Sequence, residues 1–189
     1  MRQENTREKL LDLADRLIRE KGYSSFSYAD LAKEIGISKA SIHHHFPAKE
    51  DLGLAVVEQT QTALAERLAA IRQQFSSAKE RLQAYIDIFA EGLHTPLLPL
   101  CGAMSAEMAN LPEALQMKTC DYFSFQLKWL ESVLQEAAAN GECSGVLPAD
   151  AALLVLNACE GASLVAKAVE RTDIFELTKQ QIWTALQAA

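Results

Sequence analysis

The stretch that decides the fold is ADLAKEIGISKASIHHHFPAKEDL, residues 29–52. It contains two short helical segments separated by a glycine. The first is expected to run from Tyr28 to about Ile35, where Gly36 ends it. The second covers Lys39 to His45, and Pro47 prevents its extension because proline cannot continue a helix. Two short helices joined by a glycine-containing turn predict a helix-turn-helix.

Side chains at the predicted helix starts support these boundaries. Ser27 is followed three residues later by Asp30, which resembles a capping box with aspartate in place of glutamate. Ser38 stands where it can cap the second helix. Ala32 is small enough to let the two helices approach closely.

An amphipathic segment precedes this pair. From Thr6 to Lys21, apolar residues recur at helical spacing, and Gly22 ends the pattern. The members of the apolar stripe are Leu10, Leu13, Ala14, Leu17 and Ile18. The N-terminal part is therefore expected to be a three-helix helix-turn-helix domain.

The rest of the chain also favours helices. Helical segments are expected at 49–74, from about 78 to 93, at 101–109, 112–139, 148–170 and from 173 to the C-terminus. No convincing strand is found. The predicted fold is all-α with about nine helices, divided into a helix-turn-helix domain at 1–48 and a helical bundle at 49–189.

The net charge of −7 is unevenly distributed. Residues 1–54 contain nine Lys/Arg and nine Asp/Glu, whereas residues 55–189 contain nine and sixteen. The first part is therefore compatible with a polyanionic partner and the second is not. Hydrophobic residues make up 49% of the chain, which excludes a disordered protein.

We find no apolar run of about 18 residues and no secretory signal, so we expect a cytoplasmic protein without a membrane segment. The four cysteines form no CxxC pair. Three consecutive histidines on a helix point about 100° apart, so His43, His44 and His45 cannot converge on one ion. We expect no metal and no cofactor.

The residues from about Thr6 to Leu54 resemble the TetR family of one-component repressors. The matching positions are Leu11, Ala14, Leu17, Gly22-Tyr23, Ser27, Leu31-Ala32, Gly36, Ser38, Ile42, His45-Phe46, Lys49 and Leu52. The resemblance implies a DNA-binding head followed by a helical body that binds a ligand and forms a homodimer. The remainder matches by architecture alone.

The first turn of the second short helix, Lys39 to Ser41, is expected to face base edges in the major groove. Lys49 combines its charge with a helix N-terminus, and both favour phosphate. Family members usually carry tyrosine where this chain has His43. The DNA-facing positions implied by the resemblance are Ser27, Tyr28, Lys39, Ala40, Ser41, His43, His44, His45 and Lys49.

A second candidate site lies at residues 98–108. Cys101 stands at a predicted helix N-terminus, which would favour its thiolate and hence reaction with an electrophile or oxidant. The stretch resembles the NemR-like branch of the same family, in which a cysteine here reports reactive species. The alternative is that Cys101 is a small buried hydrophobic residue.

A non-covalent inducer would bind in an apolar pocket of the body. Candidate contacts, each of which can equally be a core residue, are Phe89, His94, Met104, Met108, Tyr122, Phe125 and Trp129. The last two helices are expected to form the homodimer, through small residues at 158–163 and through Leu156, Leu164, Ile174, Ile182 and Trp183.

These features together predict a repressor that binds a palindromic DNA operator as a dimer. A small-molecule inducer, or modification of Cys101, would release it by a population shift. Two alternatives remain, namely an all-helical enzyme and a helical adaptor that binds protein only. Against an enzyme, the chain lacks a nucleophile–base constellation, a glycine-rich phosphate loop and an HExxH motif.

Overall fold

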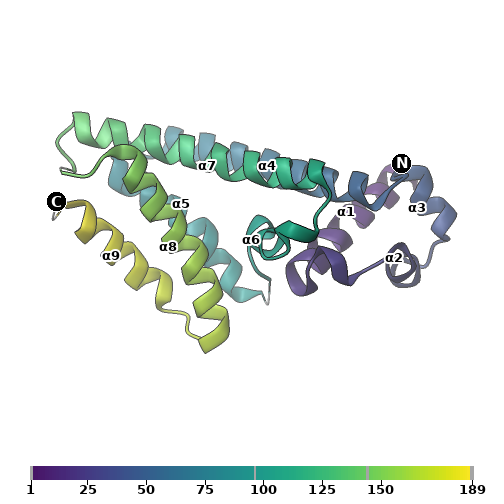
Figure 1. Cartoon of the computed structure of the whole chain (residues 1–189). Helices are drawn as coiled ribbons and strands as arrows, with labels where there is room; N and C mark the ends of the chain where they lie inside the picture. Colours follow the sequence, from purple (N-terminus) through teal and green to yellow (C-terminus); the bar gives the residue numbers. More distant parts are fainter. Residues whose placement is uncertain (1, 96, 144, 188–189) are drawn as a thin grey trace. The chain divides into compact units, whose positions relative to one another are not determined.

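The computed structural model describes residues 2–95, 97–143 and 145–187, and every regular element in these ranges is helical (Figure 1). The α-helices are α1 (Arg2–Lys21), α2 (Tyr28–Ile35), α3 (Lys39–His45), α4 (Lys49–Gln74), α5 (Ala78–Glu91), α6 (Leu100–Ser105), α7 (Glu113–Ala139), α8 (Pro148–Val169) and α9 (Ile174–Gln187). Three short 3₁₀ turns are η1 (Tyr23–Ser25), η2 (Gly92–His94) and η3 (Met108–Asn110). The predicted all-α class is confirmed.

The chain forms two compact units. One contains residues 1–63 and 100–122, and the other contains residues 64–99 and 123–189. The first unit thus holds the predicted head, the start of α4, and α6 with the start of α7. The domain boundary expected between residues 48 and 49 remains a prediction.

The predicted caps of the helix pair are present. The Ser27 hydroxyl accepts a hydrogen bond from the Ala29 N–H at 3.2 Å, while the Asp30 carboxylate accepts from the Ser27 N–H at 2.7 Å. Gly36 ends α2 with φ of 77°, a left-handed conformation that favours glycine. The Ser38 hydroxyl accepts from the Ser41 N–H at 3.2 Å and so starts α3.

The apolar stripe of α1 forms the centre of the first unit. Leu10, Ala14 and Ile18 are fully buried, and Leu31 of α2 and Ile42 of α3 are buried as well. Each short helix therefore contributes few anchors to this core. Helix α6 packs against α1 within the same unit.

Two sequence-based boundaries are wrong. Helix α1 begins at Arg2 rather than Thr6. The helix expected at 101–109 ends at Ser105, because Glu107 leaves the helical conformation with φ of −111° and ψ of 15° and a 3₁₀ turn follows. The Ser105 hydroxyl donates to the Cys101 carbonyl at 2.7 Å inside the shortened helix.

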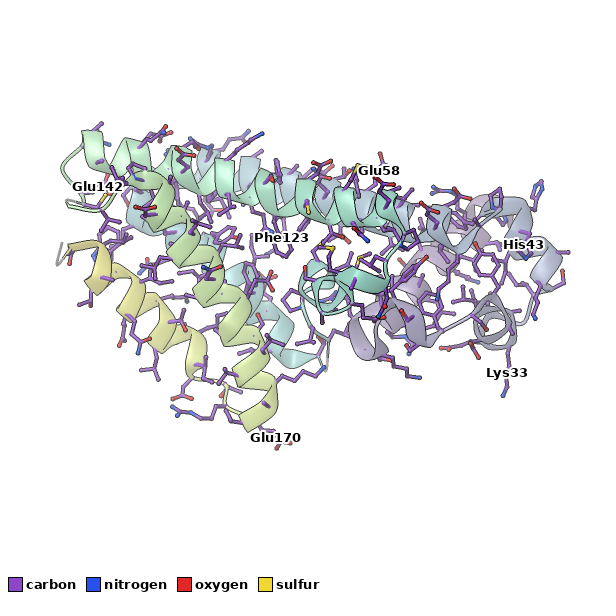
Figure 2. The ribbon with its side chains drawn as sticks, viewed as in Figure 1. Lys33, His43, Glu58, Phe123, Glu142 and Glu170 are labelled. Carbon is purple, nitrogen blue, oxygen red and sulfur yellow. The ribbon has the colours of Figure 1, made fainter. Side chains whose placement is uncertain are left out.

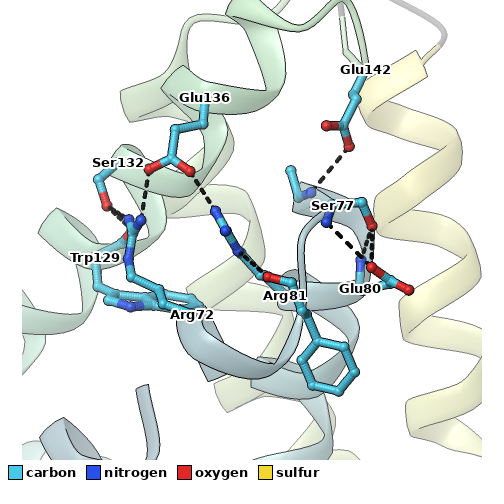
Figure 3. Close-up of polar contacts among 10 residues, drawn as sticks. Arg72, Ser77, Glu80, Arg81, Trp129, Ser132, Glu136 and Glu142 are labelled. Atoms are coloured by element: carbon cyan, nitrogen blue, oxygen red, sulfur yellow. Dashed lines mark hydrogen bonds and ion pairs between the residues drawn. The ribbon is translucent and has the colours of Figure 1, made fainter. Parts of the chain in front are cut away.

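In the second unit, α5, α8 and α9 pack against one another. Polar contacts bring α7 together with the end of α4 and the start of α5 (Figure 3). Glu136 of α7 accepts from Arg72 at 2.6 Å and also pairs with Arg81. The start of α5 carries a complete capping box formed by Ser77 and Glu80.

Among the described residues, one helix meets the length and composition of a membrane span. This helix is α8, whose most apolar 18-residue window has a mean hydropathy of 1.5 and is 39% buried. This window tolerates up to two charged residues, so α8 meets the criterion although Glu160 and Lys167 interrupt its apolar run. The core helices of globular proteins meet the same criterion.

Candidate nucleic-acid interface

Helix α3 presents most of its length to solvent. Ile42 is 0% exposed and fixes the helix on the core, whereas Lys39, Ala40, His43 and His44 are exposed. Ser41 and His45 flank this exposed face and are half-buried. The structure therefore brings together, on one short helix, the predicted DNA-facing residues between 39 and 45.

Tyr28 lies inside the unit instead of on its surface. Its side chain is buried, and its hydroxyl lies 2.8 Å from the Phe46 carbonyl oxygen and 2.6 Å from that of Ala48. Burial, with a smaller effect of the Asp51 charge, raises the pKa of Tyr28 to about 12. Tyr28 thus holds the segment that follows α3 in place, a role different from the predicted contact with DNA.

His43 is oriented by the same segment. Its Nδ1 lies 3.0 Å from the Pro47 carbonyl oxygen, and its ring packs edge-on against Tyr28 with centroids 4.9 Å apart. A carbonyl oxygen only accepts, so Nδ1 carries the proton and Nε2 is directed away from this bond. Figure 2 labels His43 on the exposed α3. The ring can donate through Nε2 only when it is doubly protonated.

Lys49 makes contacts that sequence reasoning did not foresee. Its Nζ donates to the carbonyls of Tyr23 at 2.6 Å and Phe26 at 2.5 Å, and lies 4.5 and 4.2 Å from the centroids of their rings. Burial lowers the pKa of Lys49, while the charges of Glu107 and Asp30 act in the opposite direction. Lys49 therefore joins the start of α4 to the connection between α1 and α2.

Ser27 is exposed, but its hydroxyl is engaged locally. The hydroxyl donates to the Asp30 carboxylate at 2.7 Å while it accepts from the Ala29 N–H. This bond and the Ser27 N–H lower the pKa of the Asp30 carboxyl. A phosphate at this helix start would meet the Asp30 charge, so Ser27 functions as a cap in this structure.

The comparisons with known proteins agree on one family. The family model described as "Bacterial regulatory proteins, tetR family" matches residues 10–56. The crystal structure of a TetR transcriptional regulator from Legionella pneumophila is 31% identical, covers 95% of this chain and 96% of that chain, and superposes with a TM-score of 0.86. The chain belongs to the TetR family.

Two curated relatives of the TetR family match over a shorter range. The regulator CymR from Pseudomonas putida is 35% identical over 86 residues, which are 46% of this chain and 42% of CymR. The repressor NemR from Escherichia coli is 30% identical over 82 residues, 43% of this chain and 41% of NemR. These matches span less than half the length of each relative. The family match at 10–56 covers the core of the head and the whole of α3.

The predicted TetR-family sensor residue, Cys101, is 1% exposed and lies within α6. Its burial agrees with the alternative that it is a small core residue. Cys159 is also buried, Cys143 is half-buried, and Cys120 is exposed. Among the described residues, no group of three His, Cys, Asp or Glu side chains is placed to hold a metal ion.

The candidate ligand contacts are divided between the two units. Phe89, Phe125 and Trp129 belong to the second unit and are half-buried, whereas Met104, Met108 and Tyr122 belong to the first, with Met104 fully buried. The side chain of His94 lies outside the described residues. Of this set, the structure places Phe89 and Trp129 around a shared neighbour, Tyr85.

Sequence reasoning missed two polar residues of the second unit. Gln126 is 1% exposed, and its side-chain Nε2 has no hydrogen-bond partner. Glu160 of α8 is half-buried, and burial raises the pKa of its carboxyl to about 7. A polar residue that interrupts the apolar face of a predicted helix was the available signal for both.

Proposed function

We propose that this chain is a transcriptional repressor that binds a palindromic DNA operator as a homodimer. The observation that carries the proposal is the exposed face of α3, with Lys39, Ala40, His43 and His44 displayed on a helix that Ile42 anchors. A helix of this kind enters the major groove, where its first residues meet base edges. The electrically neutral segment 1–54 carries this face, whereas the acidic excess lies in residues 55–189.

The second copy required for a palindrome has a candidate surface on α8 and α9. Leu154 and Val165 of α8 and Leu177 of α9 are 42%, 52% and 41% exposed. They line an open groove of about 550 Å³, in which a Cβ added at Gly161 would meet no atom within 4 Å. Large exposed apolar patches mark protein interfaces, and an isologous contact would pair this face with itself.

The predicted dimer residues are distributed over two roles. Leu156 and Ile182 are 5% and 4% exposed and therefore belong mainly to the core of their own unit. Leu164 is 57% exposed and remains available to a partner. The dimer surface we propose is thus the outward side of α8 and α9. It includes Leu164 from the predicted residues but not the buried Leu156 and Ile182.

Release from DNA would follow binding of a small-molecule inducer to the body. The burial of Cys101 favours a non-covalent inducer, because a thiol must be reached before an electrophile can modify it. Modification of Cys101 is tested with Cys101→Ser. If the variant is still released from DNA by an electrophile, Cys101 is not the sensor.

Operator binding is tested with the full chain and genomic fragments selected by the protein itself. Lys39→Ala should weaken binding and reduce the dependence of affinity on salt by about one counterion. Lys128→Ala is the matched control, since Lys128 is exposed on α7 in the second unit. The absence of salt-sensitive binding to any selected fragment would contradict the proposal and favour an adaptor that binds protein.

A further inference from the structure

Helix α7 carries two buried side-chain nitrogen donors that have no hydrogen-bond partner. They are the side-chain Nε2 of Gln126 and the indole Nε1 of Trp129. A buried donor left without an acceptor destabilises the folded state. The two residues are three positions apart, so they lie on the same side of the helix. The second unit thus maintains adjacent donors at a cost in folding free energy.

Tyr85 of α5 determines how the Gln126 amide is turned. The Tyr85 hydroxyl donates to Gln126 Oε1 at 2.7 Å, and this bond uses the oxygen end of the amide. The two N–H groups of Nε2 are consequently directed away from the tyrosine hydroxyl. On the side away from Tyr85, the Gln126 amide can therefore only donate hydrogen bonds.

Aromatic rings adjoin these donors. The Tyr85 ring stacks on Trp129 with centroids 5.7 Å apart and an interplanar angle of 22°. Phe89 packs on Tyr85 at 5.5 Å. The surroundings of the donors are therefore apolar and flat, which suits a planar organic molecule.

The cation that lies over the Trp129 ring is already paired. The Arg72 Cζ lies 5.8 Å from the Trp129 ring centroid, but its guanidinium is hydrogen-bonded to Glu136 and to Ser132 (Figure 3). The hydrogen bond from Arg72 is the main cause that lowers the pKa of the Glu136 carboxyl. An anionic ligand would lose its hydration here without gaining an unpaired cation, and burying such a charge is costly.

We propose that Gln126 and Trp129 hold the carbonyl oxygen of an uncharged aromatic ligand. A carbonyl oxygen accepts two hydrogen bonds, which matches one N–H from each side chain. The rings of Tyr85, Phe89 and Trp129 would contact the apolar body of the same molecule. This inference rests on the proposed function to the extent that it names the chemical class of the inducer.

Three naphthalene probes of similar size test the ligand class. They are 2-acetylnaphthalene with a neutral carbonyl, 2-ethylnaphthalene without an acceptor, and 2-naphthoate with a charge. Binding is followed by tryptophan fluorescence in full-length Trp183→Phe, because the chain has two tryptophans and Trp129 then reports alone. We expect 2-acetylnaphthalene to bind about tenfold more tightly than either of the others, the value of one hydrogen bond.

Variants of the amide test the residues. Gln126→Leu should reduce the preference for the acetyl probe, because only the Trp129 donor remains, while Gln135→Leu, an exposed glutamine on the same helix, should retain the full preference. The double variant Tyr85→Phe/Gln126→Leu leaves neither partner of the 2.7 Å bond unpaired. It should melt no earlier than the parent protein and show the same reduced preference as Gln126→Leu.

Three results would overturn the proposal. They are no binding of 2-acetylnaphthalene, equal binding of the acetyl and ethyl probes to the parent protein, and a preference that is undiminished in the double variant. All measurements are made without DNA. A failure here is therefore distinguishable from a failure of operator binding, which the Lys39→Ala experiment tests separately.

Discussion

The Glu107 carboxylate accepts a hydrogen bond from the Ser24 backbone N–H at 3.0 Å, although 83 positions separate the two residues in sequence. The bond ties the end of α6 to the η1 turn that leads into the helix pair. Gly22, with φ of 90°, makes room for it: a Cβ there would lie 1.8 Å from Glu107 Oε1. The absence of a side chain at Gly22 and the position of the Glu107 carboxylate therefore depend on each other.

A double-mutant cycle tests the coupling between Gly22 and Glu107. Gly22→Ala should lower the free energy of unfolding by about 2 kcal/mol, from an L-residue at positive φ and from displacement of the carboxylate. In a Glu107→Ala background, Gly22→Ala should cost about 1 kcal/mol less, because no carboxylate remains to be displaced. Denaturant unfolding of the four proteins measures the coupling. Strict additivity would show that the two residues act independently.

Lys49 and Lys39 should respond differently to the same substitution. Lys49→Met should lower the free energy of unfolding by about 2 kcal/mol, since two carbonyls lose a charged donor. Lys39→Met should change it by less than about 0.5 kcal/mol because Lys39 is exposed. Operator binding at several salt concentrations should show a reduced slope for Lys39→Met only. A reduced slope with unchanged stability in Lys49→Met would restore its predicted phosphate contact.

His43 should contribute to operator binding. Its Nδ1 donates to the Pro47 carbonyl and its ring packs against Tyr28, so the exposed ring is held in one orientation. His43→Gln should therefore weaken binding to a selected operator fragment, while His44→Gln serves as the neighbouring control. Equal affinities of wild type and His43→Gln would show that His43 does not contact the operator.

Glu160 should make the protein less stable at high pH. Burial raises the pKa of its carboxyl to about 7 from 4.5. The folded state therefore binds a proton that the unfolded state has lost between these values, so stability is complete below about pH 4.5 and falls as pH rises through about 7. The total loss is about 3 kcal/mol. Unfolding of Glu160→Gln across this range should show a smaller decline than wild type; an equal decline would assign the effect to another group.

The proposed dimer should be broken by charge on the outward side of α8. Leu154→Glu/Val165→Glu places two carboxylates in the apolar groove and should yield a monomer by light scattering. Leu147→Glu is the control, since Leu147 is 70% exposed but does not line the groove. A double variant that retains the mass of a dimer would locate the interface elsewhere.

Local signals account for what the sequence predicted correctly. The bounds of α2, α3 and α4 depend on caps and breakers within a few residues, such as Ser27, Gly36 and Ser38. Contacts distant in sequence account for the rest. Lys49 meets carbonyls 26 and 23 positions away, and Tyr85 meets Gln126 across 41. The periodicity of the sequence does not encode such pairs. The location of the candidate site in the head could therefore be predicted, but the contacts that each side chain makes could not.

Because Ile42 is the single buried residue of α3, the sequence of this helix can change without loss of the fold. Ile42 alone is buried in that helix, while the exposed side chains of Lys39, Ala40 and His44 contribute little to its packing on the core. Substitutions at these exposed positions therefore change the free energy of unfolding very little. New operator preferences can accumulate through single substitutions, because the protein produced by each substitution still folds. In this protein, evolutionary freedom to change the DNA target is separated from the demands of the core.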